Sequence, residues 1–220
     1  MSSPRSPLAA KQADFTQGLI LNAGVALLLE RPNAELSVRA VAKRAEMSER
    51  TIFRYFPNRD ELLEAVAMET FRRIEEPPYP TSIAELLDYP HAMFQQFERA
   101  SALTKAGLHS DIYHRIRTMD AANRLVAIRK LLDRAAPERP EDERRLAAAN
   151  IHYHVIASTW RYYRDYFGFS LADTIDAACT CIQQILLGLG ISLPQTRLEG
   201  FAGRQPMLQT TGHSTARRRR

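Results

Sequence analysis

Glycine and cysteine are both scarce in this sequence, which holds nine glycines and two cysteines among 220 residues. The scattered glycines form no glycine-rich loop that could hold a phosphate group, and we find no nucleophilic triad, so the common enzyme signatures are missing. Cys179 and Cys181 are too few for a disulfide framework, and two positions apart on a helix they point to different faces. We interpret them as small core residues and expect no enzyme.

Long apolar runs are also missing. The longest stretch without a charge, residues 177–194, is interrupted by Thr180, Gln183 and Gln184, so it does not resemble a membrane span. Residues 1–15 lack the apolar centre of a signal peptide. We therefore expect a cytoplasmic protein.

The net charge of +5 is unevenly distributed along the chain. Residues 194–220 hold six basic residues and one acidic residue, and the rest of the chain is balanced. A second basic region runs from Ser37 to Arg59, with six basic residues against two acidic ones. A local stripe of this kind favours contact with phosphate groups.

Apolar residues recur at helical spacing almost everywhere, and no stretch shows the alternation of a half-buried strand. The sequence therefore predicts an all-α protein. A first helix has an expected apolar stripe of Phe15, Leu19, Ile20, Ala23 and Leu27. A fourth helix begins after Asn58, which can form a capping box with Glu61. The proline-rich segment 75–82 then predicts a boundary between two domains, at residues 12–74 and 80–191.

Two short helices are predicted between the first and fourth, at residues 37–45 and 48–56. Ser37 and Ser48 can each cap one of them, and about three residues separate them, which is typical of a helix-turn-helix over about residues 37–56. Val38, Val41 and Ala42 form the inner face of the first. Ile52 and Phe56 lie four apart on the second, so its arginines face outward. We expect this second helix to enter the major groove of DNA, where arginine can bind guanine.

The segment "LSVRAVAKRAEMSERTIFRYFPNRDELLEAVAMETF" resembles the DNA-binding domain of the TetR family of bacterial transcription regulators (TetR/AcrR type). The resemblance covers about residues 12–74. It implies double-stranded operator DNA as partner, no cofactor and no metal, with phosphates contacted mainly by Ser37, Tyr55 and Arg59. The implied DNA-binding residues are Ser37, Arg39, Glu49, Arg50, Thr51, Phe53, Arg54, Tyr55 and Arg59.

Two positions differ from the usual family pattern. Glu46 stands in the turn where the family usually has glycine, and a positive φ there would cost about 1 kcal/mol. Phe53 stands where a tyrosine that donates to phosphate is common. Phenylalanine keeps the packing of that ring and loses the hydrogen bond.

The second half of the chain ends in two predicted long helices, over about residues 142–191. The first of them has two apolar sides, one through Leu146, Ala149 and Tyr153 and the other through Ala148, Ile151 and Val155, and both continue to about residue 167. A helix with two apolar sides needs two surfaces to bury them. We expect one side to pack on the protein's own core and the other to form a homodimer of the kind TetR-like proteins use, with Ile182 and Leu186 of the last helix as candidate partner-facing positions. A wholly buried helix in a monomer is the alternative.

Apolar and aromatic residues between the boundary and the last helices can line a pocket for a small-molecule effector, although the same residue types also build cores. The candidates are Met93, Phe94, Phe97, His109, Tyr113, Ile116, His152, Ile156 and Trp160.

A metal-binding helical protein or enzyme is the alternative function. Asp88 with His91 and Asp111 with His114 each place a carboxylate and an imidazole one helical turn apart. We expect Pro90 to interrupt the first pair, and further inward glutamates are missing.

Residues 194–220, with Arg217 to Arg220 at the end, show little periodicity, so a disordered basic tail is expected. The sequence as a whole predicts a transcription regulator, a ligand-responsive repressor that binds a palindromic operator as a homodimer.

Overall fold

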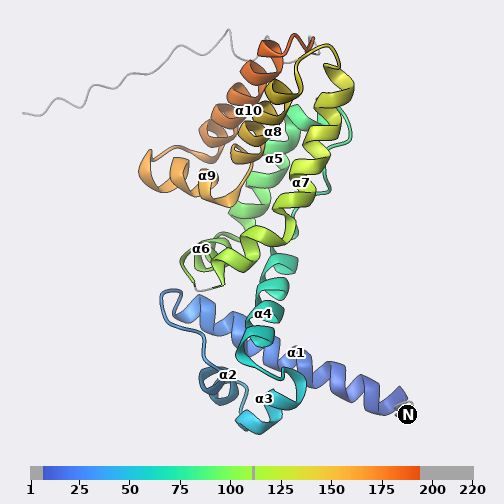
Figure 1. The fold of residues 1–220 in the computed structure, drawn as a ribbon. Helices are drawn as coiled ribbons and strands as arrows, with labels where there is room; N and C mark the ends of the chain where they lie inside the picture. The colour runs from blue at the N-terminus through green and yellow to red at the C-terminus, as the bar shows by residue number, and fades with distance from the viewer. Residues whose placement is uncertain (1–6, 111, 194–220) are drawn as a thin grey trace, which may run out of the picture.

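Every regular element in the described part of the chain is a helix, as the sequence predicts. The fold comes from a computed structural model that describes residues 7–110 and 112–193, so the expected tail at 194–220 lies outside the described residues. The helices follow one another as an N-terminal group of four and a larger C-terminal group (Figure 1). They are α1 (Pro7–Glu30), α2 (Val38–Arg44), α3 (Glu49–Tyr55), α4 (Arg59–Ile74), α5 (Ile83–Arg99), α6 (Ser101–His109), α7 (Tyr113–Ala135), α8 (Glu141–Tyr153), α9 (Ala157–Arg161), the π-helix η1 (Tyr162–Tyr166) and α10 (Leu171–Gly188).

Only the second half of α1 is covered by the rest of its domain. Ile20 and Ala23 are buried, but Phe15 is 68% exposed and Leu19 is 39% exposed. The expected stripe is therefore wrong in its first two residues, because the start of α1 projects beyond the other helices of the domain (Figure 1). Farther along, a Cβ at Gly24 would lie 2.6 Å from Val66 Cγ2, so α1 and α4 cross closely at this glycine.

Helix α4 connects the two groups of helices. Asn58 caps it by accepting from Glu61 N at 2.9 Å, which confirms the predicted helix start. The Glu61 carboxylate accepts from the Asn58 side-chain amide at 2.8 Å, in place of the backbone N–H of a full capping box. Its expected inner face, Leu62, Val66, Thr70 and Ile74, is buried. Residues 75–80 that follow contain no helix, and α4 runs from the N-terminal group to the base of the C-terminal group (Figure 1).

The C-terminal group is a bundle in which α7 packs beside α8 and α5 beside α10 (Figure 1). Pro90 lies inside α5 and does not break it, contrary to expectation. A proline removes one helical hydrogen bond, but the buried face of α5 continues past it through Met93, Phe94 and Phe97, and this packing maintains the helix.

The predicted long helix after residue 142 is interrupted, so that expectation is wrong. Helix α8 ends at Tyr153, Ile156 is extended, and α9 and η1 follow as short turns. The Thr159 hydroxyl donates to the Tyr153 carbonyl at 2.5 Å, which satisfies an acceptor that the break leaves free.

The two apolar sides of α8 nevertheless differ in exposure, as expected. Ala148 and Ile151 are buried, whereas Leu146 is 55% and Tyr153 is 60% exposed. On α10 the expectation is wrong, because Ile182 and Leu186 are both 0% exposed within one subunit and belong to its core. Cys179 is buried and Cys181 half-buried, in keeping with two reduced residues on different faces.

Candidate nucleic-acid interface and internal cavity

The α2–α3 unit is a helix-turn-helix with both predicted caps in place. Ser37 Oγ accepts from Ala40 N at 3.2 Å, and Ser48 Oγ accepts from Thr51 N at 3.1 Å. In the turn, Glu46 has a φ of 56°, the left-handed conformation for which the family's glycine is suited. The two helices are thus started by local side-chain bonds, as the sequence predicts.

The inner face of this unit also agrees with the prediction. Val41 and Ile52 are fully buried, and Phe56 is 4% exposed. Burial of these side chains fixes the rotation of α3 about its own axis. Glu49, Arg50, Phe53 and Arg54 consequently lie on its exposed side.

Two aromatic residues flank the arginines of α3. Phe53 is 44% exposed, and the Arg54 guanidinium lies 5.2 Å from the centre of the half-buried Tyr55 ring. That contact orients the Arg54 side chain across the outer surface without neutralising its charge. Thr51 is less accessible, because its hydroxyl is 2.9 Å from Ser48 Oγ.

Arg59 has a structural role that sequence reasoning missed. Its Nε donates to the Leu36 carbonyl at 3.2 Å, and its guanidinium pairs with Glu35 at 3.1 Å. These bonds connect the start of α4 with the segment that precedes α2, so Arg59 holds the helix-turn-helix against α4. Arg39 is exposed on α2.

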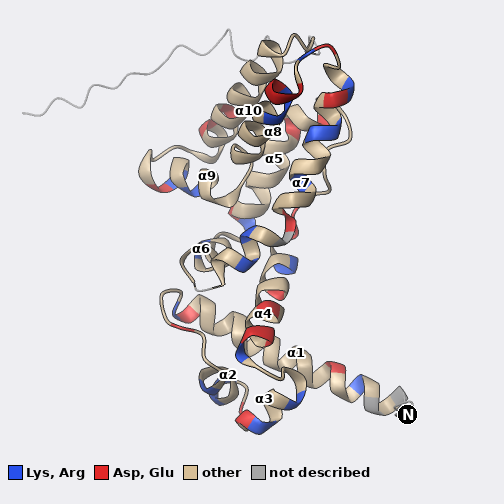
Figure 2. Ribbon diagram, in the orientation of Figure 1, with Lys and Arg blue, Asp and Glu red and all other residues tan. Residues whose placement is uncertain are grey.

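Lysine and arginine positions lie on α2 and α3, at the end of the molecule far from the C-terminal bundle, and others lie on the bundle itself (Figure 2). Arg39, Lys43, Arg50 and Arg54 are all exposed on α2 and α3. Arg44 is paired with Glu30 of α1 at 3.1 Å, so it contributes less free positive charge. The arrangement gives the outer surface of α2 and α3 a net positive potential.

A second feature lies at the opposite end of α4. A cavity of about 460 Å³ is lined by residues from the end of α4, from α5, α6 and α7, and from the α8–α9 region. Phe71 and Ile74 of α4 form part of its wall. The volume is in the range of small-molecule sites.

One end of this cavity is polar and charged. Arg124 of α7, whose side chain is 5% exposed, pairs with Glu76 and with Asp120, the latter at 2.9 Å. Asp120 also accepts from the Tyr79 hydroxyl. Burial raises the pKa of Glu76, an effect that the nearby Arg124 charge opposes. Burial likewise lowers the pKa of His152, which lines the same cavity.

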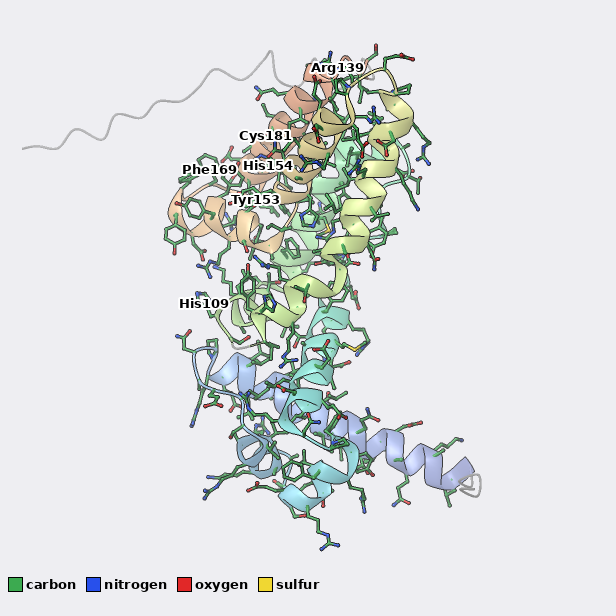
Figure 3. All side chains as sticks on the ribbon, viewed as in Figure 1. His109, Arg139, Tyr153, His154, Phe169 and Cys181 are labelled. Carbon is green, nitrogen blue, oxygen red and sulfur yellow. The ribbon has the colours of Figure 1, made fainter. Side chains whose placement is uncertain are left out.

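Some of the residues that the sequence predicts for a pocket line this cavity, and the others do not. Phe97, Tyr113, Ile116, His152 and Ile156 line the cavity. Met93, Phe94 and Trp160 are instead buried in the adjoining core, where Trp160 packs 6.0 Å from Phe97 between ring centres. His109 is exposed at the edge of α6 (Figure 3) and contacts Arg161 at 2.8 Å.

The charged residues of the cavity were missed by sequence reasoning. Glu76 belongs to the segment interpreted only as a boundary, and Asp120 with Arg124 has the ordinary spacing of a surface ion pair on a helix. Only the packing of α7 against the end of α4 brings the three together.

The alternative metal site gains no support from geometry. Asp88 and His91 are 3.9 Å apart, and each side chain is about half exposed. Asp111 lies outside the described residues. Among the residues that are described, no group of three or more histidine, cysteine, aspartate or glutamate side chains could hold a metal ion.

A helix-turn-helix whose second helix exposes two arginines defines a class of DNA-binding proteins. Residues 20–66 match the family model of bacterial regulatory proteins of the tetR family. This match identifies the N-terminal domain as a DNA-binding domain of the tetR type and supports a DNA-binding transcription regulator.

A solved structure shows the same fold over most of the chain. A TetR-like transcriptional regulator from Rhodococcus sp. RHA1 aligns with a TM-score of 0.54 at 16% identity, over 85% of this chain and 100% of that one. A TetR transcriptional regulator from the same organism aligns with a TM-score of 0.48 at 20% identity, over 82% of this chain and 99% of that one. No curated protein sequence matches the chain. None of the helices in residues 7–110 and 112–193 has both the length and the apolar character needed to cross a bilayer.

Proposed function

We propose that this regulator is a homodimeric repressor that binds a palindromic operator and releases it when a small molecule enters the cavity. The observation that carries the proposal is the position of α4. Arg59 at its start holds the helix-turn-helix, and Phe71 and Ile74 at its end line the cavity. One rigid helix therefore contacts both places, and the proposed domains, residues 12–74 and 80–191, meet along it.

The proposed DNA contacts follow from which side chains are exposed. Arg50 and Arg54 project from α3 and can reach base edges in the major groove, where each bidentate contact with guanine discriminates by about 1–3 kcal/mol. Ser37, Tyr55 and Arg59 are assigned to phosphates, as the resemblance to the family implies. The remaining members of the proposed interface are Arg39, Glu49, Thr51 and Phe53.

The dimer is proposed on the exposed sides of α8 and α10, which pack beside each other in one subunit. On α8, Leu146, Ala149 and Tyr153 are exposed at steps of three and four residues. On α10, Thr180 is half-buried, and Gln184 and Leu187 are exposed at similar steps. A second copy of this surface would cover both stripes and form a four-helix bundle between subunits.

Release of the operator requires only that the ligand prefer one arrangement of the dimer. A molecule that binds better when the end of α4 is displaced changes the spacing of the two α3 helices, so operator affinity falls. By linkage, operator DNA must weaken ligand binding by the same factor.

Selection of bound sequences from random DNA, with the full chain, tests the proposal. We expect a palindrome whose half-site centres are about 34–36 Å apart, or slightly more, with affinity that falls steeply as salt rises. Transcription in vitro from a promoter carrying that palindrome should fall when the protein is added. Recovery of single, unpaired half-sites would argue against the dimer, and increased transcription would argue against repression.

A further inference from the structure

We propose that the cavity binds an uncharged, largely apolar molecule that carries a hydroxyl or carbonyl group at one end. This inference rests on the proposed function, because it names the class of ligand for the same cavity. The apolar part of the ligand is specified by the walls. Phe71, Ile74, Phe97, Ile116 and Ile156 contribute aromatic and branched aliphatic side chains to them.

The polar group of the ligand is specified by unused hydrogen-bonding atoms. In the described part of the chain, four buried side-chain nitrogen or oxygen atoms lack a hydrogen-bond partner, and three of them belong to residues lining this cavity. They are Thr104 Oγ1, Arg124 Nε and His152 Nε2. Thr104 is only 2% exposed and Arg124 only 4%. Buried polar groups are nearly always paired, so three unpaired ones around one cavity indicate a missing partner.

The chemistry of these atoms selects an oxygen. Arg124 Nε can only donate, and the Thr104 hydroxyl can donate or accept. A carbonyl oxygen accepts from both, and a hydroxyl can in addition donate to His152 if that nitrogen is the unprotonated one. A hydroxyl or carbonyl oxygen at the polar end of the ligand therefore matches the hydrogen-bonding character of these atoms.

The absence of charge on the ligand follows from the ion pairs that already exist there. Arg124 contacts both Glu76 and Asp120, and Asp120 is further bonded by Tyr79. An anion would lie beside two carboxylates, and a cation beside a buried guanidinium, so either would be desolvated without a free opposite charge. Arg117 is the remaining cation at the cavity. It is exposed and lies 5.9 Å from the Tyr113 ring centre, where water screens it.

Four probes of one shape test the class of ligand by calorimetry on the full chain. They are biphenyl-4-ol, 4-acetylbiphenyl, biphenyl-4-carboxylate and biphenyl-4-ylmethylammonium. We expect the two neutral probes to bind, and each charged probe to bind at least tenfold more weakly. A charged probe that binds as tightly as the neutral ones, or failure of both neutral probes to bind, would overturn the proposal.

A matched pair of variants locates the polar contact. Thr104→Val removes an unpaired hydroxyl and should weaken biphenyl-4-ol binding by about three- to tenfold, the effect of one hydrogen bond. Thr118→Val is the control, because Thr118 also lines the cavity while its hydroxyl donates to the His114 and Arg115 carbonyls. Thr104→Ser should keep the affinity. Equal losses in Thr104→Val and Thr118→Val would refute the assigned contact.

Failure of this inference can be distinguished from failure of the proposed function. The four probes need no variant and no DNA, so they test the class of ligand even if Thr104→Val does not fold. The effect of a bound probe on operator affinity is measured separately. Tight binding of a charged probe that releases the operator would overturn the class of ligand and leave the function standing. Binding of biphenyl-4-ol without a change in operator affinity would overturn the proposed function and leave the class of ligand standing.

Discussion

The Arg124 guanidinium on α7 pairs with the carboxylate of Glu76, two residues beyond the end of α4. Both side chains are largely buried, and the Arg124 Nε atom next to this pair has no partner. A ligand that bonds to Arg124 therefore acts directly on the contact that holds the end of α4 in place.

We predict that Glu76→Gln weakens the coupling between cavity and operator. The amide has the same size and keeps an oxygen that can accept from Arg124, and Asp120 still pairs with that guanidinium, so we expect the fold to remain intact. We expect the change in operator affinity caused by biphenyl-4-ol to shrink at least threefold, as measured by fluorescence anisotropy of labelled operator. Glu138→Gln, at an exposed residue between α7 and α8, is the control. An unchanged response in Glu76→Gln would remove this ion pair from the mechanism.

Arg50→Ala and Arg54→Ala should each relax or abolish sequence preference without unfolding the protein. Both side chains are exposed, so their removal leaves the core untouched. We expect each to lose about 1–3 kcal/mol of discrimination at one operator position, measured by binding to single-base variants of the selected palindrome. Arg99→Ala, at an exposed arginine of α5, should behave like the unmodified protein. Unchanged selection by both α3 variants would reject this helix as the reader of the bases.

The dimer surface can be tested with one charge on α10. Leu187 is 53% exposed within one subunit, so Leu187→Glu should fold but should move the sedimentation profile toward the monomer. Val126→Glu on α7 adds the same charge at a side chain that is 51% exposed and lies outside the proposed surface. A dimer of unchanged stability in Leu187→Glu would place the interface elsewhere.

Glu46→Gly should stabilise the protein. The φ of 56° at this residue is strained for any side chain, and glycine adopts it freely, so we expect a gain of about 0.5–1 kcal/mol in the free energy of unfolding by urea. Ala122→Gly, at an exposed position inside α7, should lose about the same amount. A loss in Glu46→Gly would mean that its side chain makes a compensating contact.

Stability in acid should depend on Glu69 of α4. Hydrogen bonds from Arg72, supported by the adjacent Arg73, lower the pKa of Glu69 to about 2. Because the folded-state pKa lies below the value of 4.5 for the unfolded chain, this stabilisation is present above pH 4.5 and is lost as the pH falls toward 2. We expect Glu69→Gln to lower the free energy of unfolding by about 1 kcal/mol at pH 7, because the exposed Arg72 is screened by solvent.

The difference between Glu69→Gln and the unmodified protein should shrink steadily below pH 4.5. Urea unfolding between pH 7 and pH 3 measures this difference. Parallel curves over that range would show that Glu69 does not titrate abnormally.

The helix-turn-helix could be predicted from sequence because its determinants are local. Ser37 and Ser48 bond three residues ahead, and Ile52 and Phe56 are neighbours on one helical turn. Glu46 departs from glycine at the one turn position whose φ is positive. Neighbours of this kind are visible in the sequence itself.

The cavity could not be predicted in the same way. Glu76 and Arg124 are 48 residues apart, and nothing in either segment shows that they meet. The break at residues 154–156 also changes which side of the chain faces inward, so the apolar spacing that holds for α8 does not continue through η1. The position of Ile182 and Leu186 in the core depended on which helices flank α10, and apolar periodicity alone does not say that.

Trp160 is the only tryptophan of the chain, and it lies 6.0 Å from Phe97, a wall of the cavity. Its indole Nε1 donates to Glu98 at 3.1 Å, and the ring is 1% exposed. The protein therefore contains its own fluorophore one ring away from the cavity. Entry of a molecule beside Phe97 changes the surroundings of a single emitter, so the occupancy of the cavity can be followed without a label, with or without DNA.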